Sequence, residues 1–218
     1  STIISNSQIK NNPNTISIVE SNTTGITSGC TLEMFYDSSI GVQESTDKVT
    51  IKQHQNSKNK HRFKPGDGVF VLSESEINNL NLNEKEKSII KKYVNSSHVG
   101  RYYIDFQNEY LLYCTDEVKN NINDYPNIKK HLDNVKEFIT SSNKPYGLHR
   151  PRKSKYFESP KLICKGMFAK PEFHIDYQSY YFGFSFTSII QKDTNYSLEF
   201  LLAILNSKFG ENWFKTNG

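Results

Sequence analysis

Helix-start signals and short apolar runs alternate along this chain at irregular intervals, and this irregularity is the strongest constraint on its fold. Ser73 and Asn83 each precede a glutamate by three residues, which predicts a capping box and a helix at each position, the second covering residues 84–94. Because no strand–helix–strand rhythm repeats, the pattern favours an α+β fold or a mixed sheet over a doubly wound sheet. Apolar runs typical of buried strands lie at 69–72, 109–114, 160–164, 173–177 and 180–190.

Two later segments show helical periodicity. In residues 125–139, apolar side chains recur at helical spacing just after Pro126, a residue favoured in the first turn of a helix. Ser197 predicts the start of a last helix, whose apolar face extends to Phe209 and which ends at Gly210.

The chain is hydrophilic but rich in aromatic residues. Its 218 residues are 35% hydrophobic, and the mean hydropathy is −0.66. The 13 Tyr and 14 Phe are nevertheless far more than disordered chains carry. A folded domain with a sizeable core is therefore expected.

The cysteines and the absence of export signals favour a cytoplasmic protein. The three cysteines lie far apart and form no CxxC pair, which indicates reduced thiols, with Cys114 and Cys164 in the core. The sequence has no recognisable signal peptide and no run long enough to span a membrane, so no membrane partner is expected.

Residues 1–34 are expected to form a polar lead-in, and residues 35–218 a single domain. The lead-in is rich in Asn, Ser and Thr, and its short β-branched clusters are consistent with an edge strand or a hairpin arm. The chain begins at Ser1 without a methionine and stops soon after the last expected helix. These ends indicate a fragment of a longer protein, truncated at the C-terminus of the domain.

Enzyme signatures are absent from the sequence. It contains no GxGxxG or GxxxxGK[ST] phosphate loop, no HExxH and no GxSxG, so we assign no catalytic residues and no metal site. The EKEK run at 84–87 is expected to be a solvated helix face, and His131 a surface residue. An isolated hydrolase is therefore the least favoured class.

Residues 145–166 alternate aromatic rings with positive charges. The net charge of +4 is modest, but eight Lys and Arg lie between Lys144 and Lys170 with a single acid. Arginine binds guanine edges or phosphates through a planar fork, lysine supplies charge to phosphates, and aromatic rings stack on bases. The segment is a candidate nucleic-acid surface. The alternative is a solvated loop that Tyr156 and Phe157 anchor to the core.

A series of short motifs, in order, resembles the TaqI-like C-terminal specificity domain of adenine-N6 DNA methyltransferases, over roughly residues 35–214. That domain also occurs in type IIG enzymes, which join restriction and modification in one chain. Each motif is short, and the resemblance lies in their number, order and spacing. The motifs are IGVQESTDKV (40–49), GDGVFVLSESEINNLNL (66–82), EKSIIKKYVNSSHVGRYYID (86–105), YLLYCTDE (110–117), YPNIKKHL (125–132), LHRPR (148–152), FESPKLIC (157–164) and FLLAILNSKF (200–209).

The resemblance implies a target recognition domain that reads a short duplex DNA sequence. Its fold would be α+β, a twisted β-rich body followed by a helical hairpin, with the helix at 197–209 as the first arm. A separate catalytic domain would bind S-adenosylmethionine and methylate a flipped adenine. That domain's Asn-Pro-Pro-Tyr/Phe motif is absent here. No cofactor is therefore expected in this chain, and S-adenosylmethionine, and Mg²⁺ in some enzymes, would belong to other domains.

The resemblance also carries over individual positions. The family's Gly-Ile-x-Thr-Gly-x-Asp-Lys pattern matches at Asp47 and Lys48, but Ser45 replaces a glycine, which makes the tight turn there less secure. Lys48 is implied to contact DNA and Asp47 to orient the loop, while Arg150 and Arg152 are implied to face the DNA. The full set of candidate DNA contacts is Lys48, Tyr146, His149, Arg150, Arg152, Lys153, Lys155, Lys161 and Lys165.

Two rival interpretations remain open at this level. In the first, the intact protein is a type IIG restriction enzyme with a nuclease domain upstream. In the second, the chain is an aromatic-rich module that binds RNA or a protein partner, and the basic segment is a solvated loop.

Overall fold

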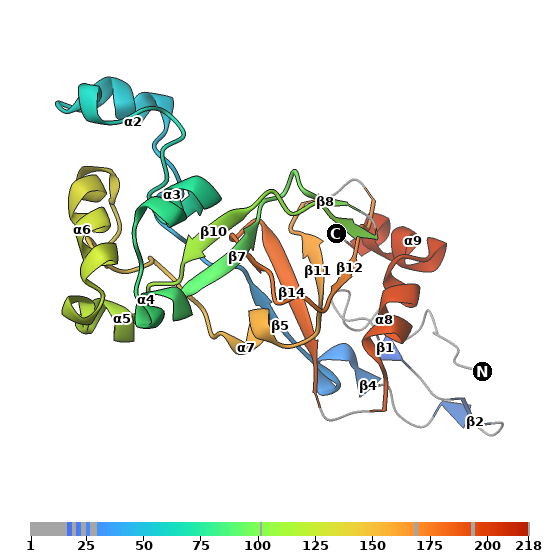
Figure 1. Ribbon diagram of the computed structural model, residues 1–218. Coiled ribbons are helices and arrows are strands. Elements are labelled where there is room, and N and C mark those ends of the chain that lie inside the picture. The colour runs from blue at the N-terminus through green and yellow to red at the C-terminus, as the bar shows by residue number, and fades with distance from the viewer. Residues whose placement is uncertain are drawn as a thin grey trace.

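The computed structural model describes residues 17–18, 21–22, 25–26, 30–100, 102–167, 170–192 and 195–217. The fold is α+β, as expected: two four-stranded sheets occupy the middle of the molecule, and helices cover its two ends (Figure 1). Most of the expected lead-in lies outside the described residues. In the described part of the lead-in, β1 (Ser17–Ile18) pairs with β4 (Cys30–Thr31), and β2 (Ser21–Asn22) pairs with β3 (Gly25–Ile26).

The first sheet has the strand order β13-β7-β10-β6. Strand β10 pairs antiparallel with both of its neighbours, and β13 joins β7 in parallel. A small hairpin, β8 (Val99–Gly100) with β9 (Tyr103–Ile104), follows β7 in the chain. The four strands of the sheet are β6 (Val71–Ser73), β7 (Ile90–Val94), β10 (Glu109–Leu112) and β13 (Tyr181–Phe182).

The second sheet is antiparallel throughout, with the order β12-β11-β14-β5. Its inner strand β11 is buried on both faces. Leu162 and Cys164 pack in a small cluster with α8, whereas Ile163 between them belongs to the main core. This alternation follows from the two-residue period of a strand. The strands are β5 (Tyr36–Ile40), β11 (Lys161–Lys165), β12 (His174–Asp176) and β14 (Phe186–Gln191).

The helices are short, and several begin at capping boxes. Ser73 and Asn83 both form the predicted boxes with Glu76 and Glu86. The α-helices preceding the C-terminal pair are α2 (Ile51–Asn56), α3 (Glu74–Asn79), α4 (Glu84–Ser88), α5 (Asp116–Asn120), α6 (Pro126–Val135) and α7 (Lys155–Glu158). The 3₁₀ turns are η1 (Leu32–Met34), η2 (Lys60–Arg62), η3 (Ile122–Asp124) and η4 (Lys136–Phe138).

The helix predicted over residues 84–94 is wrong in its second half. Helix α4 ends at Ser88, and Ile90 begins strand β7, which pairs with β10. The EKEK run is also not simply a solvated face, because Glu86 is fully buried. Its carboxylate accepts hydrogen bonds from the backbone N–H groups of Asn83, at 2.9 Å, and Asn127, at 2.6 Å. Glu86 thereby ties the start of α4 to the start of α6.

The C-terminus contains two helices rather than one. Helix α8 (Leu198–Leu205) begins at Ser197 as predicted but stops before Asn206, and α9 (Lys208–Asn217) follows. The expected single helix over 197–209 is therefore too long. Asn206 binds the backbone of Phe173 in both directions, at 3.0 and 2.9 Å, and so joins the break to the chain before β12.

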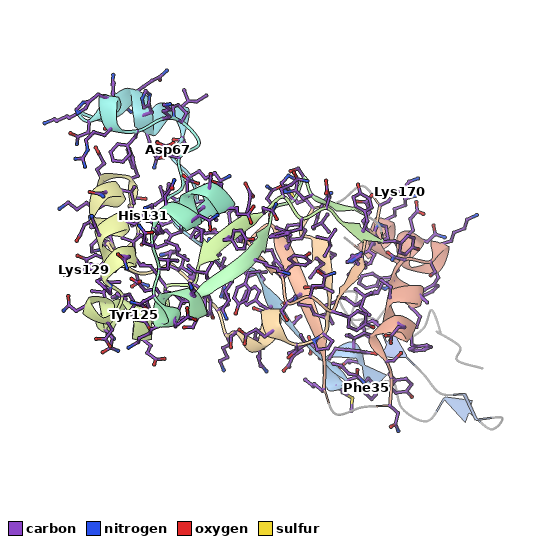
Figure 2. The ribbon with its side chains drawn as sticks, viewed as in Figure 1. Phe35, Asp67, Tyr125, Lys129, His131 and Lys170 are labelled. Atoms are coloured by element: carbon purple, nitrogen blue, oxygen red, sulfur yellow. The ribbon has the colours of Figure 1, made fainter. Side chains whose placement is uncertain are left out.

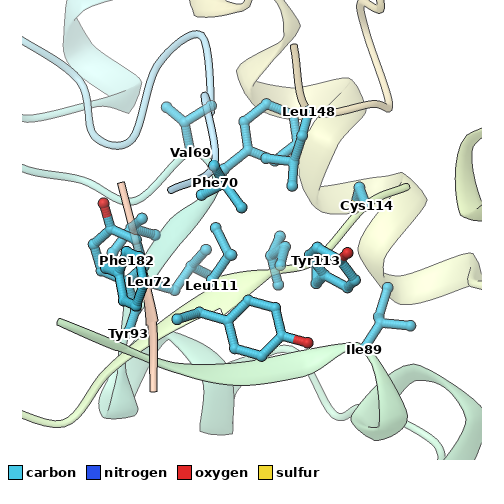
Figure 3. Close-up of a cluster of buried hydrophobic side chains, with 14 of the residues drawn as sticks. Val69, Phe70, Leu72, Ile89, Tyr93, Leu111, Tyr113, Cys114, Leu148 and Phe182 are labelled. Atoms are coloured by element: carbon cyan, nitrogen blue, oxygen red, sulfur yellow. The ribbon is translucent and has the colours of Figure 1, made fainter. Parts of the chain in front are cut away.

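The main core lies between the first sheet, the second sheet and helices α5 and α6. Figure 3 shows Val69, Phe70, Leu72 and Leu111 meeting side chains from the neighbouring strands. All four are at most 1% exposed. Burial of such side chains contributes about 1.5–3 kcal/mol each, so this core holds the two sheets together.

Candidate nucleic-acid interface

Two adjoining cavities open on the surface where the loop after β5 meets the β13–β14 turn. The first, of about 450 Å³, is lined by Gln43, Glu44, Tyr93, His149 and Phe184 among others. The second, of about 580 Å³, shares Phe184 with it. We call the two together the recognition cleft. Ser96 and Ser185 also line both cavities, and Lys165 and Met167 line the second.

Backbone pairing brings the walls of the recognition cleft together. Gln43 and Arg150 exchange two backbone hydrogen bonds, at 2.9 and 3.0 Å, and Val42 pairs with Gly183 across the first sheet's edge. The loop after β5, the basic segment and the β13–β14 turn therefore meet at one place. A Cβ atom on Gly183 would lie 2.8 Å from the Tyr93 hydroxyl. A larger residue at this position would therefore collide with Tyr93 unless one of them moved.

Glu44 is a buried carboxylate in the wall of the cleft. It is 7% exposed, and the Tyr93 hydroxyl donates a hydrogen bond to its Oε1 at 2.8 Å. Burial raises the pKa of Glu44 to about 7, the Tyr93 hydrogen bond opposes that rise, and Asp47 adds to it. A carboxylate here offers acceptors to a ligand that carries N–H donors, such as the amino edge of a base.

Ser45, the residue that replaces the family glycine, holds a left-handed backbone conformation, with φ of +85°. The tight turn is therefore formed without glycine. The Ser45 hydroxyl accepts hydrogen bonds from the N–H groups of Thr140 and Ser141, at 3.2 and 3.1 Å. These bonds offset the cost of the conformation, which is of order 1–3 kcal/mol for a non-glycine residue.

Four of the predicted DNA contacts lie at or near the recognition cleft or on the exposed surface. His149 lines the first cavity, and its buried Nδ1 atom has no hydrogen-bond partner among the described residues. Lys165 lines the second cavity, with Nζ 3.8 Å from the nearer Glu172 carboxylate oxygen. Arg150 and Lys153 are exposed. The structure places these four where a ligand can reach them.

Four others are engaged within the chain. Their partners hold the basic segment and the loop after β5 against the body of the domain. Lys48 forms an ion pair with Glu109, and Lys155 one with Asp37 at 3.0 Å. The Tyr146 hydroxyl donates to Asp133 at 2.7 Å, and Arg152 Nε donates to the Gly41 carbonyl at 3.4 Å.

The prediction that Lys161 contacts DNA is corrected by the structure. Lys161 is fully buried, and its Nζ forms an ion pair with Asp176 at 2.5 Å and donates to the Phe157 carbonyl. Burial lowers the pKa of Lys161, and the Asp176 carboxylate opposes that shift. The two residues are direct cross-strand partners on β11 and β12. Lys161 therefore has a structural role in the second sheet.

The sequence-based expectation that His131 is a surface residue is also wrong. The ring is half-buried, and its Nε2 atom lies 3.0 Å from the Val69 carbonyl oxygen, to which it donates. Burial lowers the pKa of this imidazole. Figure 2 shows His131 on α6, on the side that faces α3.

The anchoring role proposed for the aromatic residues of the basic segment is correct for Phe157. This side chain is fully buried and stacks on Tyr181, with ring centroids 4.4 Å apart. Tyr156 is half-buried beneath the Lys155 ammonium, which lies 4.8 Å from its ring centre. The segment is thus fixed at its C-terminal end, and its exposed part is the stretch before α7.

Sequence reasoning missed Glu44, Phe184 and Met167. Phe184 is 62% exposed at the β13–β14 turn and Met167 is 92% exposed after β11, although both lie in apolar runs. The Gly-Phe-Ser step within 180–190 marks a turn that interrupts the expected strand. This turn is the sequence signal from which the exposure of Phe184 could have been predicted. Nothing in the local sequence around Glu44 indicates its burial.

The structure is an α+β domain in which exposed cations lie beside a cavity lined by Gln43, Glu44 and His149. A model of the TaqI-like C-terminal specificity domain matches residues 91–217, more than half of the chain. The chain therefore belongs to the TaqI-like C-terminal specificity domain family, which confirms the family named from the motifs. This places it among the DNA sequence-specificity modules of the methyltransferase and restriction–modification context. No curated protein matches the chain.

The family match includes the basic segment and the β13–β14 turn but not the loop after β5. Within the part of the chain that the structure describes, none of the helices has the length and apolarity needed to cross a bilayer.

Proposed function

We propose that this chain is the target recognition domain of a cytoplasmic S-adenosylmethionine-dependent adenine-N6 DNA methyltransferase, and that it reads a short duplex sequence. The observation that carries the proposal is the family match over 91–217, which spans the basic segment and most of the recognition cleft. The methyl transfer itself would be performed by another domain that binds the cofactor. This chain would supply the sequence preference.

The positions of the charged and polar side chains support separate roles in base and phosphate contact at the cleft. Arg150 is exposed beside a wall that its own backbone helps to form, so its fork is available to a base edge or a phosphate. Lys153, which is exposed, and Lys165, which lines the second cavity, would offer charge to phosphates. Glu44 and Gln43 inside the cleft provide acceptors for base amino groups.

A titration of the chain against a random-sequence duplex pool tests this function. Fluorescence anisotropy at two salt concentrations should show binding that weakens steeply as salt rises, because cations on the protein displace counterions from DNA. Repeated selection from the bound pool should then yield a preferred sequence. Absence of duplex binding at low salt, or tighter binding of single-stranded RNA, would contradict the proposal.

Two substitutions separate base reading from phosphate binding. Arg150→Ala should weaken binding to the selected sequence by about 1–3 kcal/mol and relax the preference at one position. Lys153→Ala should weaken binding to all duplexes equally. It should also reduce the slope of log K against log salt by the contribution of about one phosphate contact. Lys208→Ala, at an exposed position at the start of α9, is the matched control and should change neither quantity.

The same domain in a type IIG enzyme would serve both cleavage and methylation, with Mg²⁺ required by the nuclease part. The full-length gene distinguishes the two proteins, because a type IIG enzyme carries a nuclease segment upstream in the same chain.

A further inference from the structure

The segment from residue 51 to residue 66, which we call the α2 arm, stands apart from the body of the domain and carries charge of one sign. Figure 1 shows α2 beyond α3 and α6, joined to the body by two lengths of chain. The arm contains four lysines, one arginine and two histidines, and no aspartate or glutamate. It precedes the region that matches the family.

The arm is held in place by specific contacts. Gln53 completes a capping box at the start of α2, and its Nε2 donates to the Phe138 carbonyl at 3.2 Å. Ser57 and Asn59 both donate to the Glu137 carboxylate, each at 3.1 Å. These contacts fix one face of the arm on η4 and leave the other face to solvent, where Figure 2 shows its side chains pointing outward above Asp67.

The cations of the arm are free of intramolecular partners of opposite charge. Among the residues that the structure describes, none of the five takes part in an ion pair, whereas Lys48, just before the arm, pairs with Glu109. The Glu137 carboxylate beside the arm is occupied by neutral donors, and the Asp67 carboxylate accepts the backbone N–H of Lys64 at 2.6 Å. The five exposed cations are Lys52, Lys58, Lys60, Arg62 and Lys64.

We propose that the α2 arm is a second DNA-contacting surface, which binds the phosphate backbone of the duplex beside the sequence that the recognition cleft reads. This inference rests on the proposed function. Residues 45–50 connect the loop that lines the cleft at Gln43 and Glu44 to the start of the arm, so the two surfaces are joined by a short stretch of chain.

The composition of the arm favours phosphate over a protein partner. Lys, Arg, Asn, Gln and Ser are the residues that contact phosphate oxygens. The cores of protein–protein interfaces are instead depleted of lysine and enriched in aromatic residues. Ile51, at 66% exposed, is the arm's large exposed apolar side chain. A surface of this kind gains affinity from counterion release and does not distinguish sequences.

The test compares two double variants that remove equal charge. Lys58→Gln with Lys60→Gln removes charge from the arm, and Lys208→Gln with Lys215→Gln removes it from α9 at the opposite end of the molecule. Binding of each to the selected duplex and to an unrelated duplex is measured across a salt series. Hydroxyl-radical footprinting maps the protected nucleotides, and thermal melting checks that both variants are folded.

The arm variant should lower the slope of log K against log salt by about 2, because each phosphate contact contributes about 0.9. The loss should be equal for both duplexes, and the footprint should shorten at one flank. The α9 variant should keep the slope and the footprint of the unmodified chain.

An unchanged slope in the arm variant, or an equal loss in the α9 variant, would overturn the arm inference while leaving DNA recognition intact. Each variant is also titrated against single-stranded RNA, and a loss of binding confined to that RNA would assign the arm to a different ligand and also overturn the arm inference. Failure of the unmodified chain to bind any duplex would instead remove the proposed function, so the two failures are distinguishable.

Discussion

Replacing Lys161 by methionine tests whether this cation is structural or contacts DNA. Its ammonium group is fully buried and pairs with Asp176, which is 2% exposed. Asp176 also accepts backbone hydrogen bonds from Gln178 at 2.7 Å and Tyr180 at 3.0 Å. Methionine has a similar length and no charge, so the substitution leaves a buried carboxylate without its counterion.

The expected cost is large compared with the stability of a domain. Removing one partner of a buried ion pair destabilises proteins by about 3–5 kcal/mol, against a total of about 5–15 kcal/mol. For a chain of this size, each kcal/mol lowers the melting temperature by about 2–4 °C, so a fall of roughly 6–20 °C is expected. The double variant Lys161→Met with Asp176→Asn should recover a large part of that loss, because it removes the unpaired charge.

Urea unfolding and thermal melting of the variants measure these differences, with Lys165→Met as the control. Lys165 lies on the same strand but is half-exposed, and its carboxylate partner is 3.8 Å away, so its loss should cost less than about 0.5 kcal/mol. If Lys161→Met left the melting temperature unchanged but weakened DNA binding, the structural assignment of Lys161 would be refuted.

Three further predictions concern the cleft and the C-terminal helices. The pKa of Glu44 is raised from 4.5 to about 7, so its contribution to stability is full below about pH 4.5 and is lost as pH rises through 7. In urea titrations, the free energy of unfolding of Glu44→Gln should therefore depend less on pH over that range. Relative to the unmodified chain, the variant should gain most at pH 8, by up to roughly 3 kcal/mol. A variant with the same pH dependence as the unmodified chain would contradict this prediction. At Ser45, stability should fall in the order Ser, Gly, Ala, because alanine loses both hydrogen bonds and keeps the strained φ; an alanine variant as stable as the glycine variant would show that no strain exists. Asn206→Ala should lower the free energy of unfolding by about 1–3 kcal/mol in urea titrations, because both bonds to the Phe173 backbone are lost, and no change would show that they are dispensable.

Much of the secondary structure could be predicted because its signals are local. The capping boxes at Ser73 and Asn83 each depend on a residue three positions away, and both formed as expected. The helix expected to continue through residue 94 failed for a reason outside the segment. Residues 90–93 pair with β10, Val94 pairs with β13, and strand pairing outweighed the local helical pattern.

The candidate site was only partly predictable, for the same physical reason. The sequence identified the basic segment, and Arg150 and Lys153 are exposed within it. The same reasoning treated Lys161 as equivalent to them, although the chain places it inside the second sheet. The excess of Lys and Arg in the α2 arm can be counted in the sequence, but only the structure shows that these cations are exposed and, among the described residues, form no ion pair.

The sequence by itself determined the α+β class, the family, the starts of α3, α4, α6 and α8, and the position of the basic segment. These features depend on neighbouring residues or on the order of motifs along the chain. Only the tertiary structure decided which cations are free, which are paired and which acid lies buried in the cleft. Lys161 meets Asp176 because the neighbouring strands β11 and β12 are paired, and Glu44 meets Tyr93 because the loop after β5 folds against β7. Burial and charge pairing are properties of that arrangement, and the residue types alone do not specify it.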